Sequence, residues 1–351
     1  MNLLDLTPPE AERVIAGWVR QRNQPEYRVT QIIARLWQRP VGDWDAVTDL
    51  PKDLIKALRN DFPLPRLTLA ARQRSSDGTT KFLWELPDRL AVESVLIPER
   101  RRCTLCISSQ VGCAYQCQFC ATGTMGLARN LGPWEIAAQV RELLLGDEPQ
   151  PTHVVFMGMG EPLHNWSAVD SALTMLNHPK GLGIGARRIT VSTIGIVPNL
   201  AKLASRPEQF RIAWSLHSAI AEHRLRLMPI ERKYPIARVL DALRSFPRRV
   251  TLEYVMIKGF NDSAEDTAAL SRLALELEAH VNVLPLHPGG SPTLSPASGR
   301  EIARFARGLT ARGVNVTVRR SRGLDIDAAC GQLVIESRGR EIVAEKHTGV
   351  H

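Results

Sequence analysis

The chain of 351 residues is 44% hydrophobic and 23% charged, a composition typical of a globular protein with a full core. This length accommodates one large α/β domain and a small accessory domain. No apolar run approaches the roughly 20 residues that cross a bilayer. The N-terminal stretch MNLLDLTPPEAERV lacks the basic-then-apolar order of a secretory signal. We therefore expect a cytoplasmic protein without membrane contact.

The net charge of +9 comes largely from arginine, whose planar guanidinium group matches the geometry of phosphate. Arginine clusters occur at 100–102, 187–188, 248–249 and 319–322. A polyanionic partner such as a nucleic acid accounts for this excess, and so does a solvated basic surface. Charge alone does not separate the two interpretations.

Two small units are predicted before the core. Helical periodicity predicts three short helices with proline-containing breaks between them, over 11–22, 30–36 and 52–60. Three short alternating strands follow, over 67–74, 79–86 and 90–97, with Ser76-Asp77-Gly78 as a hairpin turn. We assign 1–62 to an N-terminal helical domain and 63–98 to a β extension that leads into the core.

The rest of the chain alternates between strands and helices. Six nearly continuous apolar strands are predicted, over 105–109, 153–157, 188–193, 210–216, 250–257 and 280–286. Helical stretches separate the later strands, over 133–145, 165–176, 236–245 and 263–279. Strands of this kind suit a parallel sheet covered by helices. The predicted fold class is therefore α/β, a partial (β/α)6 barrel over 99–335 with a tail at 336–351, and its site is expected beyond the strand C-termini.

Five of the six cysteines fall within eighteen residues, at Cys103, Cys106, Cys113, Cys117 and Cys120. Clustering in a long chain of cytosolic character indicates metal binding or catalysis rather than a disulfide framework. The spacing C-x3-C-x2-C of the last three suits three thiolates on one loop, which can hold three irons of a cubane cluster and leave the fourth open. A zinc site with Cys103 or Cys106 as its fourth ligand is the alternative.

At these residues the chain resembles the radical-SAM superfamily and, within it, the RlmN/Cfr family of RNA adenine methyltransferases. The segment TLCISSQVGC at 104–113 is similar to the family's approach to the cluster loop. Four further blocks match in order, FMGMGEP at 156–162, TVSTIG at 190–195, SLH at 215–217 and DIDAACGQ at 325–332. The resemblance runs from Asn2 to Leu333, and five collinear blocks make coincidence improbable. It implies a barrel of radical-SAM type.

The resemblance implies a reaction through a methyl-cysteine. Cys330 would take a methyl group from one S-adenosylmethionine, and a radical from a second would remove a hydrogen atom from that methyl. The methylene radical would add to an adenine carbon, Glu93 would accept that carbon's proton, and Cys106 would attack the Cys330 sulfur to release the product and leave a disulfide. Taken alone, Glu93 is a strand carboxylate on a solvent face, Cys106 a core residue or metal ligand, and Cys330 a buried inert cysteine.

Two further features bear on Cys330 and its cofactors. The arginines at 319–322 could lower the thiol pKa of Cys330. The resemblance also assigns cofactor contacts, with a [4Fe-4S] cluster on Cys113, Cys117 and Cys120 and S-adenosylmethionine on Gly160, Glu161, Ser192, Ser215, Leu216, His217 and His287. The last of these departs from the family, which usually has asparagine there. Cys103 has no assigned role and is interpreted as a small strand residue.

The implied function is methylation of an adenine carbon, C2 in our interpretation, in 23S ribosomal RNA, with transfer RNA as a second candidate target. The alternatives are C8 methylation of the antibiotic-resistance type, a radical-SAM enzyme with another substrate such as a partner protein, and a non-catalytic, zinc-containing RNA-binding protein. We expect a monomer that receives electrons from flavodoxin or ferredoxin. The N-terminal helices, with Arg13, Arg20, Arg22 and Arg28, would dock RNA or merely cap the barrel.

Overall fold

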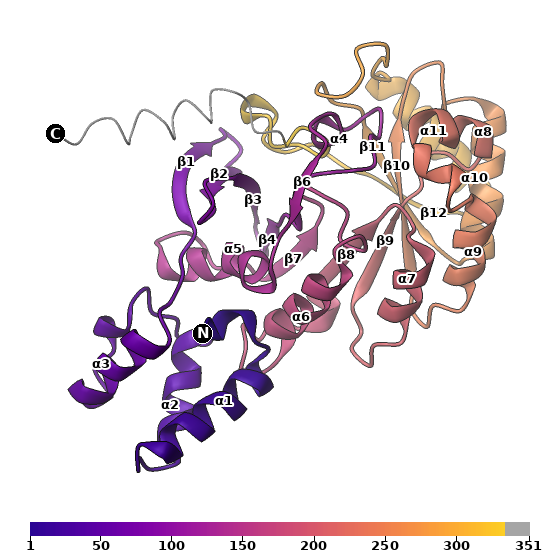
Figure 1. The fold of residues 1–351 in the computed structure, drawn as a ribbon. Helices are drawn as coiled ribbons and strands as arrows, with labels where there is room; N and C mark the ends of the chain where they lie inside the picture. The colour runs from indigo at the N-terminus through magenta and orange to yellow at the C-terminus, as the bar shows by residue number, and fades with distance from the viewer. Residues whose placement is uncertain (334–351) are drawn as a thin grey trace.

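The computed structural model describes residues 1–333, so the tail predicted at 336–351 lies outside the described residues. Three helices open the chain: α1 (Pro8–Gln21), α2 (Tyr27–Leu36) and α3 (Lys52–Asp61). The amide of Thr7 donates to the Glu10 carboxylate at 2.9 Å, which caps the start of α1. In Figure 1 the three helices lie at the opposite end of the molecule from the short helix α4 (Ala121–Thr124).

A buried arginine joins the helical domain to the barrel. Arg141, on α5 (Pro133–Leu145), is fully buried. Its guanidinium donates to the carbonyl of Leu36 at 3.0 Å and to that of Val41 at 2.5 Å. The carbonyls at the end of a helix lack partners within the helix, so Arg141 satisfies one such group at the end of α2. Burial lowers the pKa of Arg141 to about 10, and the group stays charged at neutral pH.

Within residues 1–333, ten strands form one sheet in the order β1-β2-β3-β4-β7-β8-β9-β10-β11-β12. The first three pair antiparallel, and β4 joins them to a parallel series that runs to β12. Their bounds are β1 (Thr68–Arg74), β2 (Thr80–Glu85), β3 (Ala91–Glu99), β4 (Arg102–Cys106), β7 (His153–Phe156), β8 (Ile189–Thr193), β9 (Arg211–Ser215), β10 (Val250–Met256), β11 (His280–Pro285) and β12 (Asn315–Val318).

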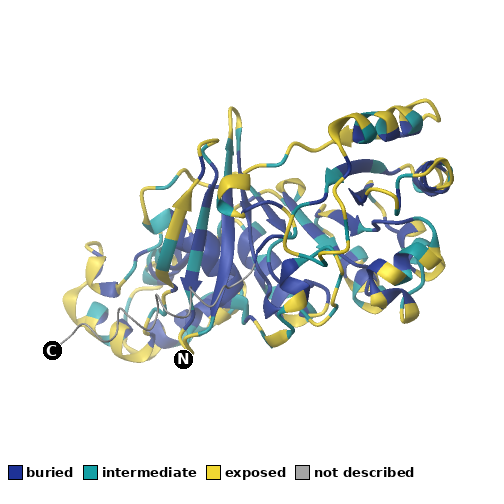
Figure 2. Cartoon of the chain, turned by 90° about the horizontal axis from the view of Figure 1, so that it is seen from above, coloured by how far each residue is buried: buried dark blue, intermediate teal, exposed yellow. Residues whose placement is uncertain are grey.

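Helices cover the outer side of this curved sheet (Figure 1). Besides α5 they are α6 (Trp166–Asn177), α7 (Val197–Ala204), α8 (Ala221–Leu227), α9 (Ile236–Arg244), α10 (Ala264–Glu276) and α11 (Gly299–Thr310). Buried residues follow the central strands, as Figure 2 shows from above. The predicted α/β fold class is therefore confirmed, because strands of this composition bury both faces only when helices and loops cover them.

The strands of the β extension, β1, β2 and β3, belong to the same sheet as the core strands. The structure differs from the predicted elements in three places. The first parallel strand begins at Arg102 rather than at 105. A hairpin of β5 (Gln110–Gly112) and β6 (Leu127–Asn130) encloses the cysteine loop. Finally, β12 adds a seventh parallel strand beyond the predicted six. In the described part of the chain, no helix has the length and apolarity needed to cross a bilayer.

We expect replacement of Arg141 by methionine to lower the free energy of unfolding by about 2–4 kcal/mol, because the Leu36 and Val41 carbonyls would stay buried without their donor. Chemical denaturation measures the change. Arg59→Met is the matched control, since Arg59 forms an exposed pair with Asp45 and its loss should cost no more than about 0.5 kcal/mol. Equal effects of the two substitutions would contradict this role for Arg141.

Candidate active site

The cluster loop, residues 113–120, is held at the top of the sheet by its own hairpin. The amide of Cys113 donates to the carbonyl of Gly126 at 2.9 Å, across the base of the loop. Gly112 adopts a φ of +77°, and a Cβ there would stand 1.9 Å from that same carbonyl oxygen. Only glycine fits this close approach. The hairpin therefore fixes where the loop begins and ends.

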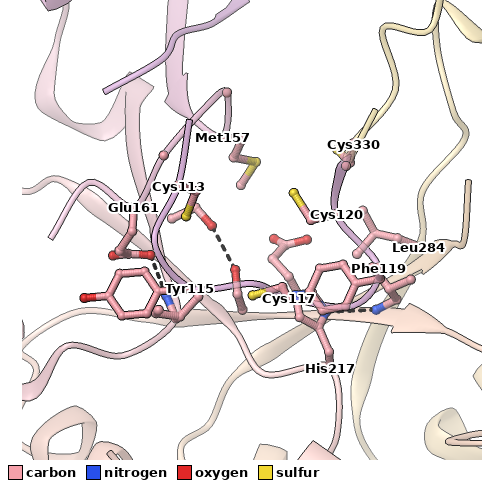
Figure 3. A pocket seen from close by; sticks show the side chains of 18 of the residues that line it. Cys113, Tyr115, Cys117, Phe119, Cys120, Met157, Glu161, His217, Leu284 and Cys330 are labelled. Atoms are coloured by element: carbon pink, nitrogen blue, oxygen red, sulfur yellow. Dashed lines mark hydrogen bonds between the residues drawn. The ribbon is translucent and has the colours of Figure 1, made fainter. Parts of the chain in front are cut away.

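The three cysteines of the cluster loop line one cavity (Figure 3). Burial raises the pKa of the Cys113 thiol to about 12 and that of Cys117 well above its usual value, and each neighbouring thiol adds to the rise. Such thiols ionise only when a cation compensates their charge. Within residues 1–333, no group of three or more histidine, cysteine or acidic side chains converges as the ligands of one metal ion would. Cys103 and Cys106, the predicted fourth ligands of a zinc site, do not line this cavity.

The cavity lies beside the C-terminal ends of the parallel strands and encloses about 150 Å³. In the same cavity, near Cys113 and Tyr115 of the cluster loop, a carboxylate follows β7 (Figure 3). Glu161 is buried and accepts hydrogen bonds from the Thr193 hydroxyl at 2.6 Å and from the amides of Ile194 and Leu163, both at 3.0 Å. Burial outweighs these bonds and raises the pKa of Glu161 to about 7. The cavity therefore places a buried carboxyl group at its wall without a paired cation from residues 1–333, and this group is partly protonated near neutral pH.

Gly160 lets the chain pass close to Gln110, just before Glu161. Its φ is +96°, and a Cβ there would stand 2.5 Å from the side chain of Gln110. Ser192 and Ser215, at the ends of β8 and β9, also line the cavity, with their hydroxyl oxygens 3.2 Å apart. Leu216 is fully buried and is not among the lining residues. Any contact that Leu216 makes with a cofactor must therefore come from its backbone.

His217 is fixed as a neutral ring. The amide of Val255 donates to its Nδ1 at 3.1 Å, so the proton of the neutral ring is on Nε2. Burial, with Arg224 adding to the effect, lowers the pKa of His217 to about 3. The ring meets Phe119 of the cluster loop edge to face at 4.4 Å. His217 thus joins the wall of the cavity to the cluster loop.

Cys330 lies on a loop, residues 323–333, that is fastened at two ends. The amide of Ala121, next to Cys120, donates to the carbonyl of Gly331 at 2.7 Å. At the other end, the hydroxyl of Ser75 in the turn between β1 and β2 donates to the Asp325 carboxylate at 2.5 Å. The amide of Gly323 donates to Asp77 in the same turn at 3.1 Å. The Cys330 loop is therefore held between the cluster loop and the first hairpin of the sheet.

Residue Cys330 is exposed at the surface, and it also lines the cavity, which corrects the interpretation as a buried inert cysteine. Its pKa is raised, because desolvation and the Glu253 carboxylate outweigh the opposing charge of Arg319. The expectation that the arginine segment lowers this pKa is therefore wrong in its net direction. Arg319 lowers the pKa of Cys330 as predicted, but desolvation of the thiol and the charge of Glu253 raise it by more.

Cys106 and Cys330 face a second cavity together. Burial raises the pKa of the Cys106 thiol, and the neighbouring Cys330 adds to the rise. All six cysteines lie within the described residues and all are free thiols, so the predicted disulfide is not present in this structure. The site combines a three-cysteine loop, a strand-end ligand cavity and a pair of thiols at its edge.

Comparison with known proteins agrees with this geometry. Residues 107–271 match the model of the radical SAM superfamily. A probable dual-specificity RNA methyltransferase RlmN of Gemmatimonas aurantiaca is 52% identical, over 100% of this chain and 98% of its own length. The chain belongs to the RlmN family.

Another relative, a dual-specificity RNA methyltransferase RlmN of Anaeromyxobacter sp. (strain Fw109-5), is 43% identical over 95% of this chain and 91% of its own length. A crystal structure of a radical SAM methyltransferase from Sphaerobacter thermophilus superposes with a TM-score of 0.87 at 42% identity. It covers 95% of this chain and 99% of its own. The RlmN architecture therefore extends over nearly the whole chain.

Glu93 has surroundings in this RlmN family member that sequence reasoning missed. The side chain is only 5% exposed, so the interpretation as a solvent-face carboxylate is wrong. Lys81 approaches its carboxylate at 3.2 Å. Glu93 shares a face of β3 with Val95, two residues on, and Val95 lines the second cavity opposite Cys106. Lys81 also reaches the carbonyl of Asp327 at 3.5 Å, in the Cys330 loop.

The residue that departs from the RlmN pattern has a partner of its own. His287 is half-buried and lines both cavities. Its Nε2 lies 2.6 Å from the hydroxyl of Ser321, and desolvation lowers the pKa of the ring. The histidine thus holds the arginine segment, residues 319–322, against the barrel, and the contact with Ser321 uses one of its two nitrogens.

Glu253 was not predicted as a site residue, yet it lines both cavities. It is buried on β10 and accepts a hydrogen bond from Asn282 at 2.9 Å. Burial raises its pKa, while Asn282 and Arg319 oppose the rise. The signal in the sequence was a single acidic residue within the apolar strand VTLEYVM. Cys103 lines neither cavity, and its thiol lies 3.9 Å from the carbonyl of Pro149.

We expect the stability of the metal-free protein to depend on Glu161 in a defined direction. Its folded-state pKa of about 7 exceeds the ordinary value of 4.5, so its contribution is fully present below pH 4.5 and is lost as pH rises through 7. Relative to Glu161→Gln, wild type should lose about 2 kcal/mol between pH 5.5 and pH 8. Chemical denaturation of both proteins at the two pH values tests this. A difference that does not change with pH would contradict it.

The fastening of the Cys330 loop can be tested without any cofactor. Ser75→Ala removes a buried hydroxyl that holds Asp325, so the amides of Gly323 and Ala328 should exchange with deuterium about tenfold faster. Hydrogen exchange followed by mass spectrometry measures peptides from 319–333. Ser205→Ala is the control, since the Ser205 hydroxyl is exposed and bonds only Lys202 locally. Unchanged exchange in Ser75→Ala would show that the turn does not hold the loop.

Proposed function

We propose that the protein methylates C2 of adenine in 23S ribosomal RNA, with transfer RNA as a second target, through a methyl group carried on Cys330. The relatives named as dual-specificity RNA methyltransferases support the substrate class. One observation carries the mechanism. The loop that is bonded to the cluster loop through Ala121 and Gly331 also brings Cys330 into the same cavity as Cys106.

Cofactor binding follows from the lining of the first cavity. Cys113, Cys117 and Cys120 would hold a [4Fe-4S] cluster, which with S-adenosylmethionine supplies a carbon-centred radical. The carboxylate of Glu161, beside Gly160, suits the ammonium group of the methionine moiety. The other residues proposed to bind S-adenosylmethionine are Ser192, Ser215, Leu216 through its backbone, His217 and His287.

The residues of the chain then have separate tasks. Cys330 carries the methyl group. It lines both cavities, so that one sulfur atom can meet the cofactor in the first cavity and the substrate in the second. Glu93 accepts the proton of the substituted carbon, and the odd electron of the base would return to the cluster. The Cys106 thiolate attacks the Cys330 sulfur, so that a disulfide forms and the bond between sulfur and product carbon breaks. The electron pair of that bond stays on the carbon, which takes up a proton from solvent to become a methyl group. A thiol reductant must restore the two thiols before the next cycle.

The proposed partners follow from the same chemistry. Reduction of the cluster requires a one-electron donor such as flavodoxin or ferredoxin. RNA must present an unstacked adenine, and the N-terminal helices, with Arg13 and Arg20 exposed, are proposed to dock it. We propose that the protein acts as a monomer in the cytoplasm.

We expect the reconstituted protein, given S-adenosylmethionine, a reductant and ribosomal RNA from an unmodified strain, to produce 2-methyladenosine in digested RNA. Cys330→Ala should produce none, because the carrier is lost. Cys103→Ala is the matched control, a buried cysteine outside both cavities, and should still methylate. Mass spectrometry of nucleosides measures the product.

In the same experiment, Cys106→Ala should leave the RNA covalently attached to Cys330, because nothing breaks the bond between the sulfur and the base. A band of protein with RNA attached that resists denaturation reports this adduct. Formation of 8-methyladenosine would keep the mechanism and change the carbon. Cofactor cleavage without any methylated adenosine would overturn the proposed function.

A further inference from the structure

The second cavity adjoins the first and encloses about 140 Å³. Cys330 belongs to the lining of both. Apolar side chains form one side of the second cavity, among them Val95 and Ile97 of β3 and Ala328 of the Cys330 loop. A thiol that takes a methyl group from one molecule and gives it to another needs a cofactor on one side and a substrate on the other. The second cavity is on the side away from the cluster loop.

Arginine dominates the polar part of this cavity. Four guanidinium groups line it, from Arg102, Arg319, Arg320 and Arg322, against two carboxylates, Glu99 and Glu253. Arg319 and Arg320 are exposed, and neither guanidinium forms an ion pair or hydrogen bond with a group in residues 1–333. Arg322 reaches Asp77 only at 3.9 Å, and Arg102 donates to the hydroxyl of Thr104 at 2.8 Å.

Two of these cations, Arg102 and Arg319, repel one another. Desolvation lowers the pKa of Arg102, the charges of Arg319 and Arg211 lower it further, and Glu99 opposes the change. A set of like charges held together by the fold is stabilised when an anion enters. The hydrogen bond between His287 and Ser321 keeps the arginine segment in this place.

We propose that the second cavity is the subsite for the RNA nucleotide, with the base against Cys330 and Cys106 and its phosphodiester on Arg319 and Arg320. This inference rests on the proposed function, which supplies RNA as the substrate. Guanidinium forks bind phosphate oxygens in pairs. The apolar wall suits an uncharged base, and the exposed arginines lie where the backbone of a flipped nucleotide would remain outside. Arg102 lines the same cavity and adds to its positive charge.

The test compares RNA binding by wild type and by the double variant Arg319→Gln/Arg320→Gln. The probe is a fluorescein-labelled RNA hairpin with one adenine in its loop, titrated at several salt concentrations and followed by anisotropy. We expect the double variant to bind about tenfold more weakly, with the slope of log Kd against log salt reduced by about 1–2. Arg300→Gln, an exposed arginine on α11, is the control and should bind within about twofold of wild type. Thermal melting verifies that each variant is folded.

A second arm asks whether the phosphate itself is recognised. The phosphodiester next to the loop adenine is replaced by a neutral methylphosphonate. Wild type should bind the methylphosphonate RNA about tenfold more weakly than the unmodified RNA. The double variant should bind both RNAs equally well, because its substitutions have already removed the contact with that phosphate. Equal losses in both proteins, or normal binding by the double variant, would overturn the subsite. If wild type methylates RNA and the double variant binds RNA as tightly as wild type, the proposed function is retained and the proposed subsite is rejected. If wild type methylates no RNA, the proposed function is rejected. The binding data then test only whether Arg319 and Arg320 bind the phosphate.

Discussion

The hydrogen bond between the amide of Ala121 and the carbonyl of Gly331 joins two parts of the chain that are 210 residues apart. This contact sets the Cys330 loop against the cluster loop, and the bond from the Thr122 hydroxyl to the carbonyl of Leu333 at 2.6 Å supports it. Without them, the Cys330 loop would keep its attachment to the turn between β1 and β2 but lose its attachment to the cluster loop. The bond from Ala121 to Gly331 is between backbone groups, so a substitution of a neighbouring side chain in the loop does not remove the donor or the acceptor. Gly331, with a φ of +83°, supplies the turn that the contact requires.

The parallel strands were predictable because their apolar, β-branched runs leave few other interpretations, and β7 through β11 lie close to their predicted bounds. The elements missed were those with weaker patterns. β5 and β6 are three and four residues long, and their pairing depends on the close approach of Gly112 to Gly126. β12 is mostly exposed at the sheet edge, so its residues lack the continuous apolar signal of a central strand.

For the site, motif spacing located the three cluster cysteines, and the resemblance supplied the tasks of Cys330, Glu93 and Cys106. What the sequence did not contain was the local environment. The burial of Glu93 beside Lys81, the net rise in the pKa of Cys330 and the contact of His287 with Ser321 all depend on packing between distant segments. Glu253 was missed for the same reason. One acidic residue in an apolar strand belongs to no motif, and its role becomes visible only from the residues that surround it in the fold. Such balances between desolvation and charge cannot be read from residue order.

The turn between β1 and β2 bonds Asp325 through Ser75, across 250 residues of sequence. Contacts of such long separation form late in folding, because the chain must lose much of its freedom before they are gained. During synthesis the turn emerges early, whereas its partner emerges only when almost the whole chain has been made. The cluster loop likewise bonds the carbonyl of Leu227 and the amide of Ser291. The site is therefore assembled from segments along nearly the whole chain, and the Cys330 loop is the last of these segments to be synthesised.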